Sequence, residues 1–331
     1  MKTIRWGIIG CGDVTEVKSG PGFQKVNNSA LVAVMRRNGE LARDYAQRHN
    51  VPRWYDDADA LINDPEVDAV YIATPPDSHC EYTLKVAQAG KPCYVEKPMA
   101  RTHAECTAMI EACRAAGVPL FVAYYRRMLP RFLKVRELLA EGAIGEPRFA
   151  TVTLYQQHKN VDPNNLPWRV VPAIAGAGIF LDLASNTLDI LDYLLSPISA
   201  VKSFAANQGS SYRAEDIVSG VWLHETGVQG MGTWCFSAFR NFDQNEIIGS
   251  KGKITFSSFG TEPVVLTTSE GSTEFDGSNP PHVQQPLIQT IVDDLNGTGK
   301  CPSTGESAAR TSWVMDEMLA AYRAQHGTGD F

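Results

Sequence analysis

The sequence predicts an α/β protein in which a doubly wound parallel sheet is followed by an α+β segment with an open, mainly antiparallel sheet. Two observations support this. Short β-rich runs alternate with helical patterns through residue 123, and strands joined by Gly and Asn turns dominate after residue 200. At 331 residues with 44% hydrophobic content, the chain is long enough for two domains. We expect a first domain over residues 1–123 and a second over residues 124–331.

The first segment contains five predicted strands separated by candidate helices. The strands cover residues 4–9, 31–35, 69–73, 93–96 and 120–123. Two of the helices begin with a Ser or Thr three residues before a Glu, namely Ser78 with Glu81 and Thr102 with Glu105. In a capping box of this kind the two side chains satisfy backbone N–H groups at the helix start. This order of elements is typical of a parallel sheet with crossover helices.

The second segment begins and ends with helices and has strands between them. The predicted helices cover residues 130–141, 178–195, 283–295 and 307–325. The predicted strands cover residues 148–155, 200–206, 217–224, 229–236, 244–248, 253–256 and 264–268. Because short turns join most of these strands, we expect a mostly antiparallel sheet.

Composition narrows the classes of partner. With 30 Lys and Arg against 37 Asp and Glu, the net charge is -7, which argues against a nucleic-acid partner because phosphate backbones bind basic surfaces. One basic cluster is interpreted as the solvated face of a helix rather than an anion site. Its members are Arg126, Arg127, Arg131, Lys134 and Arg136. No stretch approaches the roughly 20 apolar residues of a membrane span, so we predict no membrane partner.

Cysteine and histidine usage indicates a reduced, metal-free protein. The seven cysteines form no CxxC pair, and an odd number does not suit a disulfide framework. The seven histidines show no metal-ligand spacing. Glycines at positions 7, 10 and 12 interrupt the N-terminal region before a signal-peptide core forms. We therefore expect a cytoplasmic location and no bound metal.

A glycine motif follows the first predicted strand. Gly10 and Gly12 stand where the strand ends and a helix begins, followed by Asp13 and Val14. Gly10 permits a tight turn, Gly12 lets the backbone approach a pyrophosphate, and the helix N-terminus supplies amide donors. The third position is Thr15, where Gly or Ala is usual, and a bulkier residue strains the helix–strand contact. We predict a Rossmann domain with these four residues, 10 and 12 to 14, at the dinucleotide.

The end of the second strand indicates which dinucleotide binds. NAD sites usually carry an acid there for the ribose 2′-hydroxyl, whereas a 2′-phosphate needs a cation. Here the strand runs into Arg36 and Arg37, and the next acid is Glu40. We predict NADP(H) over NAD(H), with Arg36 as the main 2′-phosphate partner and Arg37 as its stacking neighbour. The alternative is a pair of solvated loop arginines.

Three further motifs extend this pattern along the chain. They are ATPPDSH at residues 73–79, EKP at residues 96–98 and GAGIFLDLASNTLD at residues 176–189. Together with the glycine motif, their order and spacing resemble the Gfo/Idh/MocA family (glucose–fructose oxidoreductase, inositol dehydrogenase, rhizopine catabolism). The resemblance spans the whole chain. It implies NAD(P)-dependent dehydrogenase or reductase activity on a sugar, a cyclitol or a related polyol or carbonyl compound.

The resemblance also implies roles in the first domain. Lys97 would lie beside nicotinamide and substrate, next to Glu96, and the peptide bond to Pro98 is often cis in relatives. Thr74, Pro75 and His79 would lie near the cofactor. For His79 we prefer a packing or hydrogen-bonding role at a helix start to chemistry.

The position of Lys97 suits catalysis without the resemblance, because ligands of a doubly wound sheet bind at the carboxyl ends of its strands. A partly desolvated lysine beside a positive ring can exchange a proton near neutral pH. It would protonate the alkoxide that forms when a hydride reaches a carbonyl carbon. The alternative is an exposed turn lysine with Glu96 as its ion-pair partner.

Three polar residues share one face of the predicted helix at 178–195. Asp182, Asn186 and Asp189 are spaced at i, i+4 and i+7, and the helix is otherwise apolar. Because a polar stripe on a buried helix needs partners, we expect a hydroxylated ligand at the first two. Asp182 is our second candidate catalytic residue. For Asp189 we expect a structural salt bridge or hydrogen bond.

Asn186 departs from the family pattern, which commonly has a histidine there. An amide donates and accepts hydrogen bonds but does not exchange a proton. Proton transfer would then fall to Lys97, relayed through Asp182, or to Tyr124, Tyr155 or His158. Asn186 would still bind substrate.

Further substrate-binding candidates stand at the expected domain interface, where ordinary packing is the alternative. They are Tyr124, Arg126, Trp168 and Arg169.

The leading prediction is an NADP(H)-dependent oxidoreductase acting on a carbohydrate-like alcohol or carbonyl. Two alternatives stay open: a cofactor-retaining NAD(P)-dependent glycoside hydrolase of the same family, and a non-catalytic cofactor-binding regulator. An open sheet has a face and edges that need covering, so we also expect a homodimer or homotetramer through the second domain.

Overall fold

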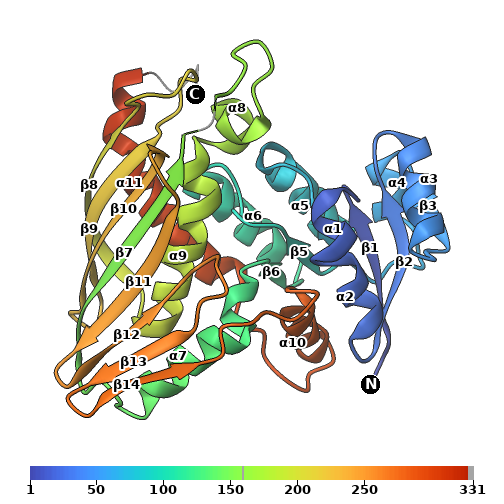
Figure 1. The fold of residues 1–331 in the computed structure, drawn as a ribbon. Coiled ribbons are helices and arrows are strands. Elements are labelled where there is room, and N and C mark those ends of the chain that lie inside the picture. The colour runs from blue at the N-terminus through green and yellow to red at the C-terminus, as the bar shows by residue number, and fades with distance from the viewer. Residues whose placement is uncertain (159, 327–331) are drawn as a thin grey trace. The chain divides into compact units, whose positions relative to one another are not determined.

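The computed structural model describes residues 1–158 and 160–326 (Figure 1). The chain forms two compact units. The first comprises Met1–Tyr125 and Pro280–Ala309, and the second comprises Arg126–Asn279 and the residues from Arg310 onward. This grouping differs from the predicted segments in two respects, because residues 124–125 and residues 280–309 belong with the first unit.

The first unit is built on a six-stranded parallel sheet in the order β3-β2-β1-β4-β5-β6. The strands are β1 (Ile4–Ile9), β2 (Ser29–Met35), β3 (Arg53–Tyr55), β4 (Ala69–Ile72), β5 (Cys93–Val95) and β6 (Leu120–Val122). All five predicted strands are present, and the short edge strand β3 was not predicted. The strand order reverses between β1 and β4, which is where doubly wound sheets bind ligands.

Helices connect these parallel strands. They are α1 (Asp13–Val17), α2 (Gly20–Lys25), α3 (Gly39–Arg48), α4 (Ala58–Ile62), α5 (His79–Gln88) and α6 (His103–Ala115). Because helices cover the sheet, its central strands are almost entirely buried and read as continuous apolar runs.

The two predicted capping boxes have different outcomes. Thr102 caps α6 as expected, since its side chain accepts a hydrogen bond from the Glu105 amide at 3.2 Å. The prediction for Ser78 is wrong. Its hydroxyl donates to Thr74 Oγ1 at 2.7 Å and to the Pro75 carbonyl at 3.0 Å instead, because the 3-10 turn η1 (Pro76–Ser78) leads directly into α5.

The late segment joins the first unit through buried hydrogen bonds. The Gln284 amide donates to the Lys18 carbonyl at 3.1 Å, just before α10 (Gln285–Leu295). The Ser303 hydroxyl donates to the Val122 carbonyl at the end of β6 at 2.7 Å. These contacts explain why residues 280–309 do not group with the second unit.

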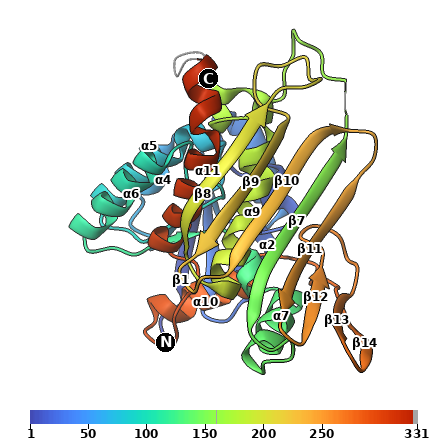
Figure 2. The same ribbon diagram turned by 90° about the vertical axis from the view of Figure 1, so that its left-hand side faces the viewer.

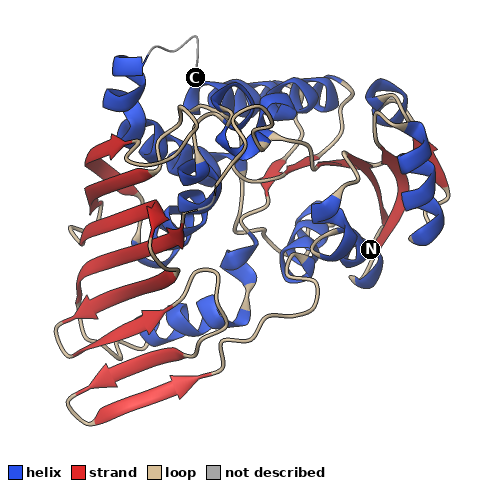
Figure 3. Cartoon of the chain, turned by 45° about the horizontal axis from the view of Figure 1, so that its top comes forward, coloured by secondary structure: helices blue, strands red, loops and turns tan. Residues whose placement is uncertain are grey.

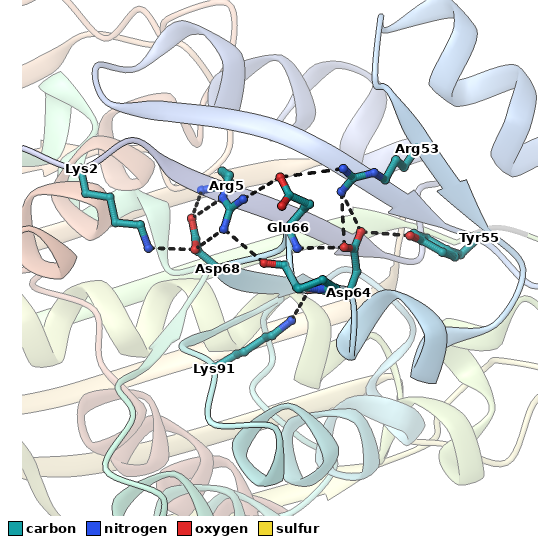
Figure 4. Close-up of polar contacts among 9 residues, drawn as sticks. Lys2, Arg5, Arg53, Tyr55, Asp64, Glu66, Asp68 and Lys91 are labelled. Carbon is teal, nitrogen blue, oxygen red and sulfur yellow. Dashed lines mark hydrogen bonds and ion pairs between the residues drawn. The ribbon is translucent and has the colours of Figure 1, made fainter.

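Ion pairs join the amino ends of the strands in the first unit (Figure 4). Asp68 stands just before β4 and accepts from Lys2 Nζ at 2.8 Å and from Arg5 Nε at 2.9 Å. Asp64 accepts from Arg53 Nη1 at 3.0 Å. Because ligands bind at the opposite, carboxyl ends of such strands, we assign this network a structural role.

The second unit is built on an eight-stranded sheet in the order β14-β13-β12-β11-β7-β10-β9-β8 (red strands in Figure 3). The strands are β7 (Pro147–Gln157), β8 (Ile198–Ala206), β9 (Ile217–His224), β10 (Gln229–Ala238), β11 (Phe242–Gly249), β12 (Gly252–Phe256), β13 (Val264–Thr268) and β14 (Gly271–Phe275). Neighbouring strands are antiparallel except β7 and β10, which are parallel. The sheet is therefore mainly antiparallel, as predicted, with β14 as an unpredicted edge strand.

One face of this sheet packs against α7 (Pro130–Ala140), α9 (Ile179–Leu195) and α11 (Gly305–His326) (Figure 1). The rings of Phe180 on α9 and Trp234 on β10 lie 5.3 Å apart. Figure 2 looks onto the opposite face, where no helix of the described part of this unit packs. We call it the open face; it carries the exposed side chains of Phe149, Phe204, Val221, Leu223 and Met231.

α9 is the core helix of the second unit. Together with the preceding turn, Pro172–Leu195 is long and apolar enough to cross a membrane by length and composition, which contradicts the prediction that no stretch is so apolar. Most of it is buried inside the chain, so packing against the sheet accounts for its composition.

Candidate cofactor and substrate sites

The turn after β1 has the geometry of a phosphate cradle. Gly10 has φ +87°, and its amide and that of Cys11 donate to the Met35 carbonyl at 2.9 and 3.1 Å. A Cβ at Gly10 would lie 2.7 Å from Thr74 Cγ2, so only glycine fits. A Cβ at Gly12 would meet nothing closer than the Gly10 carbonyl oxygen at 3.9 Å. The residues therefore fit a dinucleotide, whose pyrophosphate can approach the backbone on the open side of Gly12.

The start of α1 supplies donors for such an anion. Gly12 precedes the helix and no side chain caps it, so amides of the first turn, including those of Asp13 and Val14, have no intrahelical partner. Thr15 is accommodated in the turn although it is larger than the usual Gly or Ala. Its hydroxyl donates to the Gly12 carbonyl at 2.7 Å, and Tyr45 Oη donates to the Thr15 carbonyl at 2.9 Å.

Arg36 and Arg37 follow β2 and are exposed. Within residues 1–158 and 160–326, neither guanidinium forms an ion pair or a hydrogen bond. Arg36 lies close enough to Cys11 that its charge opposes the effect of burial, which raises the pKa of the Cys11 thiol to about 11. The Arg36 guanidinium therefore lies near the glycine turn and forms no hydrogen bond or ion pair with the described residues.

The His79 ring forms hydrogen bonds to two loops of the first unit. The ring is fully buried, with Nε2 2.7 Å from the Thr74 carbonyl and Nδ1 3.1 Å from the Pro98 carbonyl. Burial lowers the pKa of His79 below its usual value. The preferred hydrogen-bonding role agrees with this geometry. The Lys97–Pro98 peptide is cis, as the resemblance implied.

Glu96 holds the main chain of Lys97 at the carboxyl end of β5. Its Oε2 accepts from the Lys97 amide at 3.1 Å, and its Oε1 accepts from Tyr71 Oη and Gln284 Nε2, each at 2.6 Å. Glu96 thus bonds to the main chain of Lys97. The sequence does not predict a role for Gln284, because this residue lies 188 positions after Glu96 and belongs to no local motif.

In the second unit, a buried carboxylate caps α9. The Gly178 amide donates to Glu215 Oε1 at 2.9 Å and to Oε2 at 3.1 Å. A Cβ at Gly178 would lie 2.5 Å from the Glu215 carbonyl oxygen, which explains the glycine of the sequence motif. Burial raises the pKa of Glu215 from 4.5 to about 7.

The structure brings Asp182 together with two other predicted residues. Asp182 Oδ2 accepts from Arg169 Nε at 3.1 Å. The Arg169 guanidinium also lies 4.4 Å from the centroid of the Trp168 ring, which is half-buried. A carboxylate, a guanidinium and an aromatic ring are thereby gathered near the first turn of α9.

Asn186 is joined to Arg126. Its Nδ2 donates to the Asp182 carbonyl at 3.0 Å, and its Oδ1 accepts from Arg126 Nη1. Arg126 Nε also donates to the Ser258 carbonyl at 2.9 Å. Both ends of the Asn186 amide thus have protein partners. The predicted contact with a ligand would use the remaining proton and lone pair.

Comparison with known proteins gives the family. Residues 4–124 match the model described as the oxidoreductase family with an NAD-binding Rossmann fold, and residues 132–255 match the GFO/IDH/MocA C-terminal domain. The chain is 39% identical over 315 residues to Oxidoreductase P35 of Formosa agariphila, covering 95% of this chain and 97% of that one. The chain belongs to the Gfo/Idh/MocA oxidoreductase family.

Other members of the Gfo/Idh/MocA family are similar over the full length. The 1,5-anhydro-D-fructose reductase of Ensifer adhaerens is 27% identical over 329 residues, covering 97% of this chain and 96% of that one. A levoglucosan dehydrogenase, solved in complex with NADH and levoglucosan, has a TM-score of 0.85 at 22% identity and covers 98% of both chains. The latter likeness shows that the fold is shared.

In this Gfo/Idh/MocA oxidoreductase, the interpretation of the basic cluster as a solvated helix face is wrong for three of its five members. Arg126, Arg127 and Arg131 are only 7%, 2% and 1% exposed. Arg127 pairs with Asp189 through Nε to Oδ2 at 2.8 Å and Nη2 to Oδ1 at 2.6 Å, which confirms the salt bridge predicted for Asp189. The arginines are buried because distant carboxylate and carbonyl groups accept their hydrogen bonds.

The remaining candidates are placed as follows. Tyr124 is buried in the hydrophobic core of the first unit. Tyr155 on β7 lies on the open face, opposite to α9, because its neighbour Leu154 points into the core. The proton-transfer role of Tyr155 stays a prediction, and its place on the open face does not favour it. His158 follows β7 and is exposed.

All seven cysteines lie within the described residues, and none of them forms a disulfide bond there. Within the same residues, no group of three or more His, Cys, Asp or Glu side chains could hold a metal ion.

Proposed function

We propose that this family member is an NADP(H)-dependent oxidoreductase that transfers a hydride between nicotinamide and a sugar, a cyclitol or a related polyol or carbonyl compound. The observation that carries the cofactor choice is the pair of exposed, uncommitted guanidiniums at the end of β2. Arg36 would hold the 2′-phosphate, with Arg37 as its neighbour, since a planar guanidinium binds phosphate oxygens in pairs. An NAD site would need an acid at this position.

The other cofactor contacts come from loops at the carboxyl ends of β1, β4 and β5. The proposed residues are Gly10, Gly12, Asp13, Val14, Thr74, Pro75, His79, Glu96 and Lys97. Gly12 and the first amides of α1 would hold the pyrophosphate. His79 and Glu96 would act by holding their loops, as their buried hydrogen bonds indicate. When bound, the nicotinamide supplies the hydride chemistry.

Side chains of the protein would transfer the proton and bind the substrate. Lys97 Nζ would give a proton to the alkoxide formed during reduction, or take it from the alcohol during oxidation. Its positive charge would also stabilise the developing oxyanion. Asp182 would orient a hydroxyl and relay the proton. Asn186, which holds no exchangeable charge, would only bind and orient.

The substrate class is supported by residue chemistry and by relatives. Carboxylate, amide and guanidinium groups on and beside α9 suit a polyhydroxylated ligand, and Tyr124, Trp168 and Arg169 are proposed to contact it as well. Besides the anhydrofructose reductase, the Myo-inositol 2-dehydrogenase of Thermotoga maritima is 28% identical over 275 residues, covering 81% of this chain and 79% of that one.

A kinetic panel tests the proposal. Michaelis constants for NADPH and NADH would be measured with polyols, sugars and keto-sugars, on the natural chain and on Arg36→Ala. We expect the variant to raise KM for NADPH by about 10- to 100-fold with little effect on NADH, as for loss of a hydrogen bond to a charged group. Arg43→Ala on α3, another exposed arginine, is the control. A preference of the natural chain for NADH would contradict the cofactor assignment.

Two further variants or readouts test the chemistry. Lys97→Met should lose turnover while retaining NADPH affinity. If substrate is consumed with no net change in nicotinamide absorbance, the cofactor-retaining hydrolase is favoured instead. If NADPH binds tightly but no substrate in the panel is turned over, a regulatory role is favoured.

We infer that the open face makes this protein a homodimer or homotetramer. Met231 and Val221 are directly opposite each other on neighbouring strands, and both are 51% exposed. Apolar side chains gathered on one sheet face are a usual subunit interface. Sedimentation showing a monomer at micromolar concentration would contradict this inference. Because none of the seven cysteines forms a disulfide bond in the described residues, we also propose a cytoplasmic location.

A further inference from the structure

A buried amide stands behind the candidate catalytic lysine. Gln284 is fully buried at the start of α10, within the first unit. Its Oε1 accepts from Tyr94 Oη at 2.7 Å, and its Nε2 donates to Glu96 Oε1 at 2.6 Å. Both polar ends of the side chain are therefore held by protein groups. The main-chain N–H of Gln284 also donates a hydrogen bond, to the Lys18 carbonyl.

Glu96 connects the Gln284 side chain to the main chain of Lys97. A buried carboxylate needs hydrogen-bond donors, and Glu96 receives them on both oxygens. Tyr71 and Gln284 donate to Oε1, and the Lys97 amide donates to Oε2. Because the carboxylate is planar and rigid, the two donors on Oε1 fix the direction in which Oε2 points. That direction sets where the main chain of Lys97 is held.

The donors themselves are rigid. The rings of Tyr71 and Tyr94 are stacked with centroids 4.7 Å apart, and Phe23 lies 5.3 Å from the Tyr71 ring. All three rings are buried. A tyrosine hydroxyl on a packed ring has little freedom, so the network specifies a single geometry rather than a set of exchanging ones.

We propose that Gln284 is a positioning residue for hydride transfer, acting through Glu96 on Lys97. The proposal rests on the proposed function, in which Lys97 moves the proton. Removing the amide would leave Tyr94 Oη without its acceptor and Glu96 with one donor fewer. The carboxylate could then rotate, and the Lys97 backbone would sample positions from which proton transfer is slower.

The test compares Gln284→Met with the natural chain. Methionine fills a similar volume without either hydrogen bond. We expect kcat to fall about tenfold, the lower end of the range for loss of one hydrogen bond to a charged group. The KM for substrate and the Kd for NADPH should stay within about twofold. The solvent deuterium isotope effect on kcat should rise, because proton transfer becomes slower; a purely structural role would not change it.

Two variants accompany it. Tyr94→Phe keeps the ring packing and the bond from Gln284 to Glu96 but loses the hydroxyl that orients the amide. We expect a smaller fall in kcat, about threefold, with the same rise in isotope effect. Gln289→Met on the same helix is the control, because Gln289 bonds to Asn27 and Asp293 and does not touch Glu96. It should behave as the natural chain.

The outcomes separate the two proposals. If Gln284→Met and Tyr94→Phe keep kcat within twofold and leave the isotope effect unchanged, Gln284 is not a positioning residue, even if thermal stability falls. If Gln284→Met does not fold, Tyr94→Phe decides by the same criteria. If Lys97→Met retains full turnover, the role of Lys97 fails, and the inference on Gln284 fails with it.

Discussion

Replacing Glu215 by glutamine should change how stability depends on pH. Burial raises the pKa of Glu215 from 4.5 to about 7, although the Gly178 amide favours the charged form. Between these values the folded chain keeps a proton that the unfolded chain releases. The free energy of unfolding therefore decreases as pH rises from about 4.5 to about 7 and levels off above that. This decrease amounts to about 3 kcal/mol, at ~1.4 kcal/mol per pH unit.

Glu215→Gln lacks this loss because glutamine is neutral at every pH. The variant should therefore gain stability relative to the natural chain as pH rises, by up to about 3 kcal/mol between pH ~4.5 and ~7. Urea unfolding of both proteins at pH 5, 6, 7 and 8 measures the difference. Glu225→Gln, at an exposed position, is the control. A stability difference that stays constant across this range would refute the reasoning.

Three other predictions concern the glycine turn, the buried ion pair and the open face. Gly12→Val should keep the unfolding free energy within about 0.5 kcal/mol, because its side chain meets open space, yet lose binding of the nicotinamide cofactor, measured by fluorescence. Gly10→Val should destabilise the fold. Equal stability of the two variants would contradict this. Asp189→Asn should destabilise by about 3–5 kcal/mol in thermal unfolding, because Arg127 keeps a buried charge with a weakened partner, and an unchanged midpoint would count against it. Met231→Lys should shift the sedimentation of the proposed oligomer toward the monomer, and an oligomer unaltered by this change would exclude the open face as the interface.

Much of the fold could be predicted because its strands have strong patterns. The predictions for β1, β9 and β13 agree with the structure at both ends. The missed strands β3 and β14 are short edge strands with exposed or half-buried residues, so neither shows a clear apolar pattern. The parallel pairing of β7 with β10 could not be predicted, since it depends on the order of strands in space.

In the candidate site, residues of local motifs could be predicted and contacts between distant residues could not. Gly10, Gly12 and Lys97 belong to local motifs, so their positions at strand ends followed from the sequence. Buried pairs between residues far apart in the sequence do not follow from such motifs. Gln284 and Glu96 are 188 residues apart, and Arg127 and Asp189 are 62 apart. Whether a charged side chain is buried depends on such distant partners, so the local pattern of the basic cluster does not indicate that three of its arginines are buried.

The central place of β7 has a consequence for how the chain is made. β7 is the first strand of its sheet to be synthesised, yet both of its neighbours, β10 and β11, come more than seventy residues later. Its two edges stay without partners while that stretch emerges, so the nascent chain carries an unpaired, apolar strand prone to association. We expect heterologous expression to be limited at this stage, and slower translation through residues 158–228 to lower the yield of soluble protein.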